Sequence, residues 1–381
     1  MLDKKIKVLM IGSDRKLFDV NSPSAKRILS YGKIVDELHI VVFTLSNNLL
    51  SKIQLANNVW VYPTNSFCKL KYIFDAHKIA QKIIYDAGFG QSDLVSVQDP
   101  FESGLAGRKI SIENKLPLQI QIHTDMFSPY FAKNSFLNFL RIKLLAPMVI
   151  KYGTNFRVVS EKIASDLNRI YKVKKENIFI LPVRVSIDLP YQTIENNHQY
   201  TPFNKNILIV SRLTEEKNIF FALEVFSVVA KKLPDSGLVI LGDGFLKRVL
   251  QQWVYRKGLS NRVSFMGFVN DVKPFYSCVD VFMSTSLFEG FGLAILESAL
   301  AKLPIVSTPV GIAPELLKGH EDLICDFNNV QKFALKIVEL LEDNKKSVQI
   351  GEDIYSNAIK FIKTEEEYLS MYQKALTMHL K

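Results

Sequence analysis

Two glycines and two glutamates in the C-terminal half of the chain have the types and spacing of an anion-binding loop flanked by hydroxyl acceptors. Gly290 and Gly292 would let the backbone approach a ligand, and a helix expected over residues 293–302 would offer free N–H groups at its start. Glu289 precedes the glycines and Glu297 lies eight positions later. A carboxylate does not bind phosphate, but it accepts hydrogen bonds from hydroxyl groups. The four residues therefore suit a ligand with hydroxyl groups on both sides of a phosphate, such as a nucleotide sugar.

Cationic side chains must assist such a loop, because a helix dipole contributes only about 0.3–1 kcal/mol at an exposed site. Arg212 and Lys217 follow the first strand expected in this half, at residues 206–210. They could neutralise the charge that develops on a diphosphate leaving group, since charge-assisted hydrogen bonds contribute about 1.5–3 kcal/mol each. Taken singly, these features also fit solvated charges and a helix-capping glutamate.

The elements that must position these residues alternate along the whole chain. Strands are expected in the second half at 206–210, 238–241, 263–266, 279–284 and 305–308, with helices at 218–232, 245–257 and 293–302. Strands are expected in the first half at 5–11, 38–45, 59–62, 93–97, 118–123, 156–160 and 178–182. This alternation predicts an α/β protein with doubly wound parallel sheets, whose ligands lie at the carboxyl ends of the strands.

Further candidate residues stand where predicted strands end. Gly12 follows the first strand, and Gly242 and Phe268 follow two strands of the second half. His123 ends the strand at 118–123, where a histidine is either a structural hydrogen-bonding group or part of a site. The G-x-G-x-x-G fingerprint of a dinucleotide fold does not follow the first strand, which argues against a dehydrogenase.

Two motifs together resemble a known family. The segment 289–297, Glu-Gly-Phe-Gly-Leu-Ala-Ile-Leu-Glu, with its continuation through 304–311 and Glu315, resembles the Glu-x7-Glu motif of retaining glycosyltransferases of family 4, within glycosyltransferase group 1. The segment 212–218 is similar to the R-L-x-x-x-K-N element of that family. The resemblance implies the GT-B fold, in which two Rossmann-like doubly wound parallel-sheet domains face each other across a cleft.

The resemblance also implies roles for individual residues. Arg212 and Lys217 would act on the diphosphate, Glu289 on hydroxyls of the donor sugar, Glu297 on the ribose, and His123 near the reaction centre. The other donor-binding residues that it implies are Gly12, Gly242, Phe268, Gly290, Phe291, Gly292 and Leu293. A hexose would pass with retention of configuration to a glycan or lipid-linked acceptor, in synthesis of cell-surface polysaccharide or glycolipid.

A metal ion is not expected in this site. The sequence has no Asp-x-Asp and no histidine or cysteine cluster with metal-ligand spacing. Arg212, Lys217 and the helix start would supply the positive charge, and a UDP- or GDP-sugar would be a co-substrate, with no other cofactor. A sugar-nucleotide epimerase on the same fold and a non-catalytic nucleotide-sugar-binding relative stay open as alternatives, and a phosphorylase fits less well.

Composition predicts four segments in the chain. We expect an acceptor domain over residues 1–190, a polar linker over 191–205, a nucleotide-sugar-binding domain over 206–359, and a C-terminal helix over 360–381. In the family that the motifs resemble, such a helix crosses back to the first domain.

The net charge of +10 calls for an anionic partner: phosphates, nucleic acid or an anionic bilayer surface. No nucleic-acid-binding motif is present. The acid-free segment 126–160 holds the basic residues Lys133, Arg141, Lys143, Lys151 and Arg157. These basic residues fit contact with a membrane surface. The segment also fits a buried helix, because the apolar residues of 136–150 would lie on nearly all sides of that helix. Three scattered cysteines and a start without a long apolar run predict a cytoplasmic protein, or one peripheral on the inner face of the cytoplasmic membrane.

Overall fold

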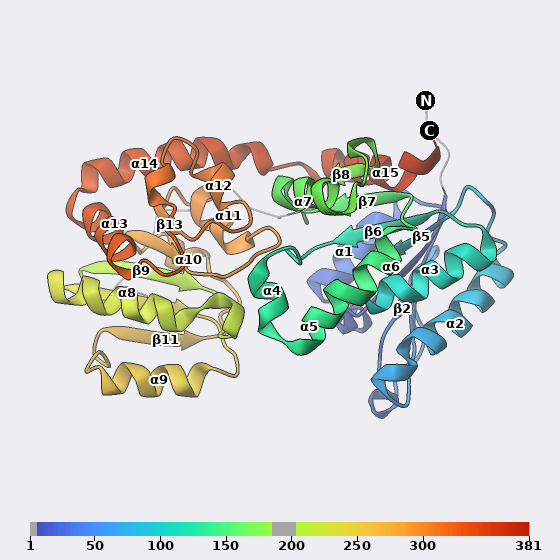
Figure 1. The fold of residues 1–381 in the computed structure, drawn as a ribbon, viewed down its shortest axis with the longest axis horizontal. Helices are drawn as coiled ribbons and strands as arrows, with labels where there is room; N and C mark the ends of the chain where they lie inside the picture. Colours follow the sequence, from blue (N-terminus) through green and yellow to red (C-terminus); the bar gives the residue numbers. More distant parts are fainter. Residues whose placement is uncertain (1–5, 185–202, 381) are drawn as a thin grey trace. The chain divides into compact units, whose positions relative to one another are not determined.

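The computed structural model of the chain describes residues 6–184 and 203–380. Contacts divide the chain into two compact units, one formed by Met1–Arg184 with Lys363–Lys381 and the other by Val185–Ile362 (Figure 1). Most of the linker predicted at residues 191–205 lies outside the described residues.

The first unit is built on an eight-stranded sheet with the order β3-β4-β2-β1-β5-β6-β7-β8. Its strands are β1 (Lys7–Gly12), β2 (Glu37–Val42), β3 (Ile53–Ala56), β4 (Val59–Pro63), β5 (Leu94–Val97), β6 (Leu118–Ile122), β7 (Asn155–Val158) and β8 (Ile178–Ile180). All neighbouring strands are parallel except the pair β3 and β4. The chain leaves β1 first toward β2 and later toward β5, so a topological switch point lies between β1 and β5.

The helices of the first unit connect these strands and cover the sheet. They are α1 (Pro23–Gly32), α2 (Tyr72–Ala87), α3 (Glu102–Asn114), α4 (Pro129–Asn134), α5 (Phe136–Leu140), α6 (Ala146–Ile150), α7 (Glu161–Tyr171) and α15 (Glu365–Thr377). Ser22 caps α1 by accepting a hydrogen bond from the Ala25 amide, and Pro23 occupies the first helical position. Thr364 and Glu367 form a capping box at the start of α15.

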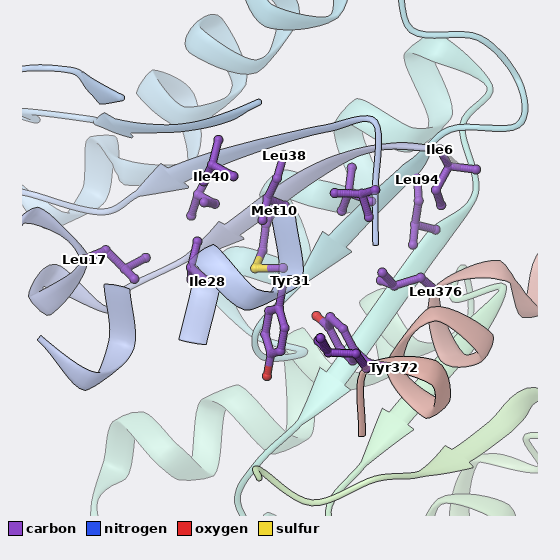
Figure 2. Packing of buried hydrophobic residues seen from close by; sticks show 14 of the residues in the cluster. Ile6, Met10, Leu17, Ile28, Tyr31, Leu38, Ile40, Leu94, Tyr372 and Leu376 are labelled. Atoms are coloured by element: carbon purple, nitrogen blue, oxygen red, sulfur yellow. The ribbon is translucent and has the colours of Figure 1, made fainter. Parts of the chain in front are cut away.

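The core of the first unit contains side chains from both ends of the chain. Figure 2 shows Tyr31 of α1 and Tyr372 of α15 beside Met10 and Leu38 of the sheet. The two tyrosine rings have centroids 4.1 Å apart. Helix α15 is also fixed by its backbone, because side-chain amides of β6 and β7 donate hydrogen bonds to the Ala375 carbonyl oxygen at 2.7 and 3.1 Å. The C-terminal helix is therefore an integral part of the first unit.

The second unit is built on a five-stranded sheet with the order β11-β10-β9-β12-β13, in which all neighbours are parallel. Its strands are β9 (Lys205–Val210), β10 (Ser236–Leu241), β11 (Val263–Gly267), β12 (Val281–Ser284) and β13 (Ile305–Ser307). Its helices are α8 (Ile219–Lys232), α9 (Lys247–Arg256), α10 (Lys273–Tyr276), α11 (Leu293–Leu300), α12 (Ala313–Leu316), α13 (Val330–Glu342) and α14 (Asn344–Ala358). The carboxyl ends of all five strands share one edge, and the switch point lies between β9 and β12. The predicted α/β class with two doubly wound sheets is confirmed.

The helical run from α5 to α6 differs from the buried helix that the sequence suggested as one possibility. Its inner face packs closely on α3, since a Cβ atom at Gly104 would lie 2.7 Å from the Val149 side chain. Its outer face is exposed and apolar, with Phe136 76% exposed. A short π-helix (Arg141–Leu145) joins the two helices, and Arg141 pairs with Glu102 at 2.9 Å. Within the described residues no helix is long and apolar enough to cross a membrane.

Candidate functional site

The loops after β9 and β12 bring together Lys217 and Glu289, at the switch point of the second sheet. The Lys217 ammonium pairs with Oε1 of Glu289, and the Ser286 hydroxyl donates to the same oxygen at 2.8 Å. The two charged side chains are only 14% and 19% exposed. An ammonium group has three N–H donors, so this ion pair leaves two of them for a ligand.

The backbones of the two loops are cross-linked, which fixes the pair in place. The Thr285 hydroxyl donates to the Lys217 carbonyl oxygen at 3.0 Å, and the Leu287 amide donates to the Glu216 carbonyl oxygen at 2.7 Å. Asn218 has a left-handed backbone conformation (φ 51°) that ends the loop and starts α8. The polar run 284–286, at the end of the buried strand β12, is the sequence signal for these contacts, and it was missed.

Arg212 lies in the same loop but makes a different contact. Its guanidinium pairs with Glu216 at 2.9 Å, and its side chain is 73% exposed. Glu216 also accepts a hydrogen bond from Thr214 at 2.6 Å. The structure therefore brings Lys217 and Glu289 together and leaves Arg212 on an exposed ion pair, which is weak in water.

Gly242, after β10, is required by the packing of two loops. Gly242 has φ 131°, and a Cβ atom at this position would lie 1.8 Å from the Ser211 carbonyl oxygen. Its amide donates to the Gly267 carbonyl oxygen at 2.7 Å, which ties the β10 and β11 loops together. Phe268 follows Gly267 and its side chain is largely exposed. These contacts explain the glycine structurally, and the donor contacts of Gly242 and Phe268 stay predictions.

The glycine loop after β12 ends at the start of α11, as the sequence predicts. Gly292 has φ 95° and occupies the N-cap position; because glycine has no side chain, no side-chain cap forms and the first helical N–H groups stay available. Phe291 is buried and packs edge-on against Phe361, with ring centroids 6.2 Å apart. Leu293 is exposed, and Gly290 lies in the same loop. The anchored phenylalanine holds the loop while the backbone beside it faces no capping side chain.

Glu297 lies one turn into α11, in an environment that disfavours its charge. It accepts a hydrogen bond from the Tyr276 hydroxyl at 3.1 Å. Burial raises the pKa of Glu297, and the hydrogen bond from Tyr276 and the charge of Lys273 offset part of that effect. A desolvated carboxylate with free lone pairs gains from accepting hydroxyl hydrogen bonds.

In the first unit, Gly12 and His123 line one cavity of ≈ 220 Å³ at the carboxyl ends of β1 and β6. A Cβ atom at Gly12 would lie 2.7 Å from Cγ of Gln98, so the close approach of the β1 and β5 ends favours glycine. Arg27 and Arg157 also line this cavity. Neither arginine had been assigned to the donor site from the sequence, since nothing in their spacing distinguishes them from the other basic residues, although Arg157 is buried in the structure.

The hydrogen bonds around His123 define which of its nitrogens carries a proton. Oε1 of Gln121 accepts a hydrogen bond from Arg157 at 2.8 Å and lies 3.2 Å from Nε2 of His123. The bond from Arg157 identifies this atom as the amide oxygen, which carries no hydrogen and can only accept, so Nε2 carries the proton and Nδ1 is an acceptor. Burial lowers the pKa of His123 to about 3, with contributions from the charges of Arg157 and Arg27. His123 is therefore a neutral acceptor at physiological pH.

No group of three or more histidine, cysteine, aspartate or glutamate side chains that could hold a metal ion occurs within residues 6–184 and 203–380.

Comparison with known families assigns the second unit. Residues 193–357 match the family model described as glycosyl transferases group 1. The chain carries a group 1 glycosyl transferase domain. The matched range contains Arg212, Lys217, Glu289 and Glu297, and it confirms the predicted resemblance at the level of group 1. Assignment to family 4 and the individual residue roles stay predictions.

Relatives of this glycosyltransferase include enzymes named for glycolipid and polysaccharide synthesis. It is 22% identical over 337 residues to alpha-monoglucosyldiacylglycerol synthase of Acholeplasma laidlawii, covering 83% of each chain. It is 31% identical over 147 residues to the lipopolysaccharide core biosynthesis glycosyltransferase LpsE of Rhizobium meliloti, covering 38% of this chain and 42% of that one. The match to LpsE thus spans less than half of either chain.

Solved structures confirm the GT-B fold. Anabaena Alr3699/HepE, in complex with UDP and glucose, is similar over 97% of this chain and 98% of that one, with a TM-score of 0.72 and 20% identity. Staphylococcus aureus TarM is similar over 80% of this chain and 59% of that one, with a TM-score of 0.65 and 19% identity.

The state of His123 gives the first prediction. Because the cavity lowers its pKa below the ordinary value near 6.5, His123 contributes stability above that pH that is lost as the pH falls toward 3. We expect its ring to stay neutral, with the proton on Nε2, from pH 7.5 to 5. The measurement is a ¹H–¹⁵N NMR titration, in which the His123 signal is identified because it is lost in the variant His123→Asn. A ring that titrates near pH 6.5 would contradict this environment.

Proposed function

We propose that this glycosyltransferase moves a hexose from a UDP- or GDP-sugar to a glycan or lipid-linked acceptor, with retention of configuration and without a metal ion. The observation that carries the proposal is the buried pair of Lys217 and Glu289 at the switch point of a group 1 domain. Relatives named for glycolipid and lipopolysaccharide synthesis support cell-surface polysaccharide or glycolipid as the product class.

Lys217 would act on the leaving group of the donor. The bond between the anomeric carbon and the diphosphate oxygen breaks, and the diphosphate keeps the electron pair while the acceptor oxygen bonds to the same carbon. The two N–H donors that Glu289 leaves free on Lys217 would stabilise this growing charge in a largely buried position. Arg212, whose side chain is 73% exposed, can exchange its partner Glu216 for the diphosphate at small cost.

The glycine loop would hold the distal phosphate. The amides of Phe291, Gly292 and Leu293 stand at the unfilled start of α11, where backbone N–H groups and the helix dipole favour an anion. Gly290 would allow the close approach. These groups and the two cations together would supply the positive charge that a divalent cation supplies in metal-dependent transferases.

The carboxylates and the histidine would orient the sugar and the nucleoside by accepting hydrogen bonds. Glu289 would accept from hydroxyls of the donor sugar and Glu297 from the ribose. His123 is neutral and offers Nδ1, so it would accept a sugar hydroxyl hydrogen bond and would not act as an acid. Gly12, Gly242 and Phe268 would shape the donor site around these groups.

Loss of the lysine charge gives the second prediction. We expect Lys217→Met to lower kcat for sugar transfer by about 10²–10³-fold, the effect typical of removing one preorganised group that stabilises transition-state charge. The measurement is nucleotide release from a panel of UDP- and GDP-sugars, with oligosaccharide and membrane-lipid acceptors, in the presence of EDTA. Lys302→Met removes an exposed lysine paired with Glu352 and serves as the matched control.

The same assay separates the alternatives. Product with the donor's anomeric configuration, read from its ¹H NMR coupling constant, supports retention. Inverted product, or dependence on an added divalent cation, would overturn the corresponding part of the proposal. A donor sugar epimerised without transfer would indicate an epimerase, and binding without turnover would indicate a non-catalytic relative.

We further propose that the first unit meets an anionic bilayer through the outer face of α5–α6. Its exposed apolar side chains are Phe136, Leu137, Phe139, Leu144 and Met148. Lys133, Lys143 and Lys151 accompany them, and residues 126–160 include no acid. Each lysine near an anionic surface contributes about 1 kcal/mol, and buried apolar side chains add to this. A bilayer partner fits the diacylglycerol substrate class in the name of the relative from Acholeplasma laidlawii.

Vesicle binding gives the third prediction. We expect the protein to sediment with vesicles containing phosphatidylglycerol more than with pure phosphatidylcholine vesicles. The double variant Phe136→Ser/Leu144→Ser should bind at least about tenfold more weakly, because each side chain buries apolar surface in the interface. Phe67→Ser/Leu70→Ser removes an even more exposed apolar pair elsewhere in the first unit and serves as the control. Equal losses in both double variants, or none in either, would contradict the proposal.

A further inference from the structure

A second and larger cavity of the first unit lies away from the residues considered so far. It is a groove of ≈ 1090 Å³ lined by α2, β2, β4 and the segment 50–52. This volume is at the upper end of the roughly 300–1,000 Å³ typical of small-molecule sites. Neither Gly12 nor His123 lines it. The groove is therefore separate from the cavity at the carboxyl ends of β1 and β6.

The sheet face that forms the floor of the groove is not built as a core. In β2 and β4, alternate residues Leu38, Ile40, Val59 and Val61 belong to the hydrophobic core. The residues between them that line the groove are Glu37, His39, Trp60 and Tyr62. A parallel sheet covered on both faces is apolar on both, so this polar and aromatic face departs from the usual pattern. The His39 and Trp60 rings stack there, 4.7 Å apart.

A chain of hydrogen bonds sets the direction of each donor on this floor. Nε2 of His39 lies 2.9 Å from Glu37, and Nδ1 lies 3.0 Å from the Tyr62 hydroxyl. The Glu37 carboxylate, held ionised beside Lys7, accepts from Nε2, so Nδ1 accepts from Tyr62. The phenol oxygen of Tyr62 thus presents only lone pairs to the groove. Burial raises the pKa of Tyr62 to about 12, which keeps this pattern intact at physiological pH.

The wall of the groove carries opposite charges in one stripe along α2. Asp75, Lys78, Lys82 and Asp86 recur at helical spacing and all line the cavity. Among the residues that the structure describes, none of these four forms an ion pair or a side-chain hydrogen bond. Lys52 lies over the Tyr62 ring at 4.8 Å. Three carboxylates and three ammonium groups line the groove, so its charges balance and do not select an anion.

We propose that this groove binds a neutral saccharide. Aromatic rings on the floor match the apolar C–H face of a sugar ring, and the unpaired charges on the wall match its hydroxyl groups. Balanced charge disfavours both a nucleotide and an anionic bilayer surface. That the saccharide belongs to the glycan acceptor rests on the proposed function, whereas binding itself does not.

Tryptophan fluorescence tests the groove, because the chain has only Trp60 and Trp253. In the variant Trp253→Phe, Trp60 is the sole tryptophan, and the probes are maltotriose, cellotriose, chitotriose and mannotriose, with UDP as the comparison. We expect at least one neutral trisaccharide to change Trp60 emission saturably, with no change on addition of UDP. Asp75→Asn and Lys82→Met should each raise the Kd about tenfold, as expected for loss of a charge-assisted hydrogen bond. Lys109→Met on α3 should leave it unchanged.

Donor binding is measured on the same Trp253→Phe protein by calorimetry, which separates this proposal from the proposed function. No emission change with any trisaccharide at millimolar concentration, in protein that binds a nucleotide sugar, overturns the saccharide groove alone. A response to UDP but to no trisaccharide, or equal Kd values in Asp75→Asn, Lys82→Met and Lys109→Met, also overturns it. Saturable trisaccharide binding without nucleotide-sugar binding supports the groove and counts against the donor site.

Discussion

The ion pair between Lys217 and Glu289 is the constraint on which the site of the second unit depends. Two charges withdrawn from water cost several kcal/mol each, and removing one partner of such a pair typically destabilises a protein by about 3–5 kcal/mol. Here Ser286 shares the carboxylate, and hydrogen bonds between the loops after β9 and β12 fix the backbone on both sides. The lysine is thus held as a cation at the carboxyl edge of the sheet, and two of its N–H donors remain for an anionic ligand.

The parallel sheet determines which other residues lie at the same edge as Lys217. Because the carboxyl ends of all five strands share one edge, the glycine turn after β10 and the glycine loop before α11 reach the same side of the sheet as Lys217. The packing leaves no room for a side chain at Gly242, after β10, or at Gly311, after β13. A Cβ atom at Gly242 would lie 1.8 Å from a carbonyl oxygen, and one at Gly311 would lie 2.2 Å from the Phe291 carbonyl oxygen of the glycine loop. Close backbone packing therefore calls for glycine at both positions.

Much of this arrangement was predictable from local sequence. Alternating strands and helices predicted the sheets, because strand ends and helix starts are local features. The resemblance of segments 212–218 and 289–297 to the family motifs led to the prediction of one site. The structure brings Lys217 and Glu289 of that site into contact, and the residue roles stay predictions. The antiparallel strand β3 was missed, since its sequence Ile-Gln-Leu-Ala has no continuous apolar run and none of its four residues is buried. The two charged pairs of the site were also not predictable, because pairing Lys217 with Glu289 and Arg212 with Glu216 depends on side-chain positions that spacing does not specify.

Long-range packing explains the remaining differences between sequence and structure. The apolar residues of 136–150 suggested a helix buried on all sides as one possibility. In the structure α6 packs closely at Gly104, and only one face of the segment α5–α6 is buried. The neutral state of His123 depends on Arg157, which no local pattern connects to it. In β2 and β4 the alternation of apolar with aromatic and polar residues was visible in the sequence. The sequence does not specify the sheet order, which places the aromatic residues side by side on one face, beside α2, and so forms the groove.

The measurement that tests the central claim most directly is thermal stabilisation by a panel of UDP- and GDP-sugars, on wild-type protein and on Lys217→Met. At a ligand concentration 100 times Kd, binding adds about 2.7 kcal/mol to the free energy of unfolding, which raises Tm measurably. The account predicts that one donor stabilises the wild type and that the variant loses most of this gain. Absence of any shift with every nucleotide sugar, or an equal shift in both proteins, would contradict it.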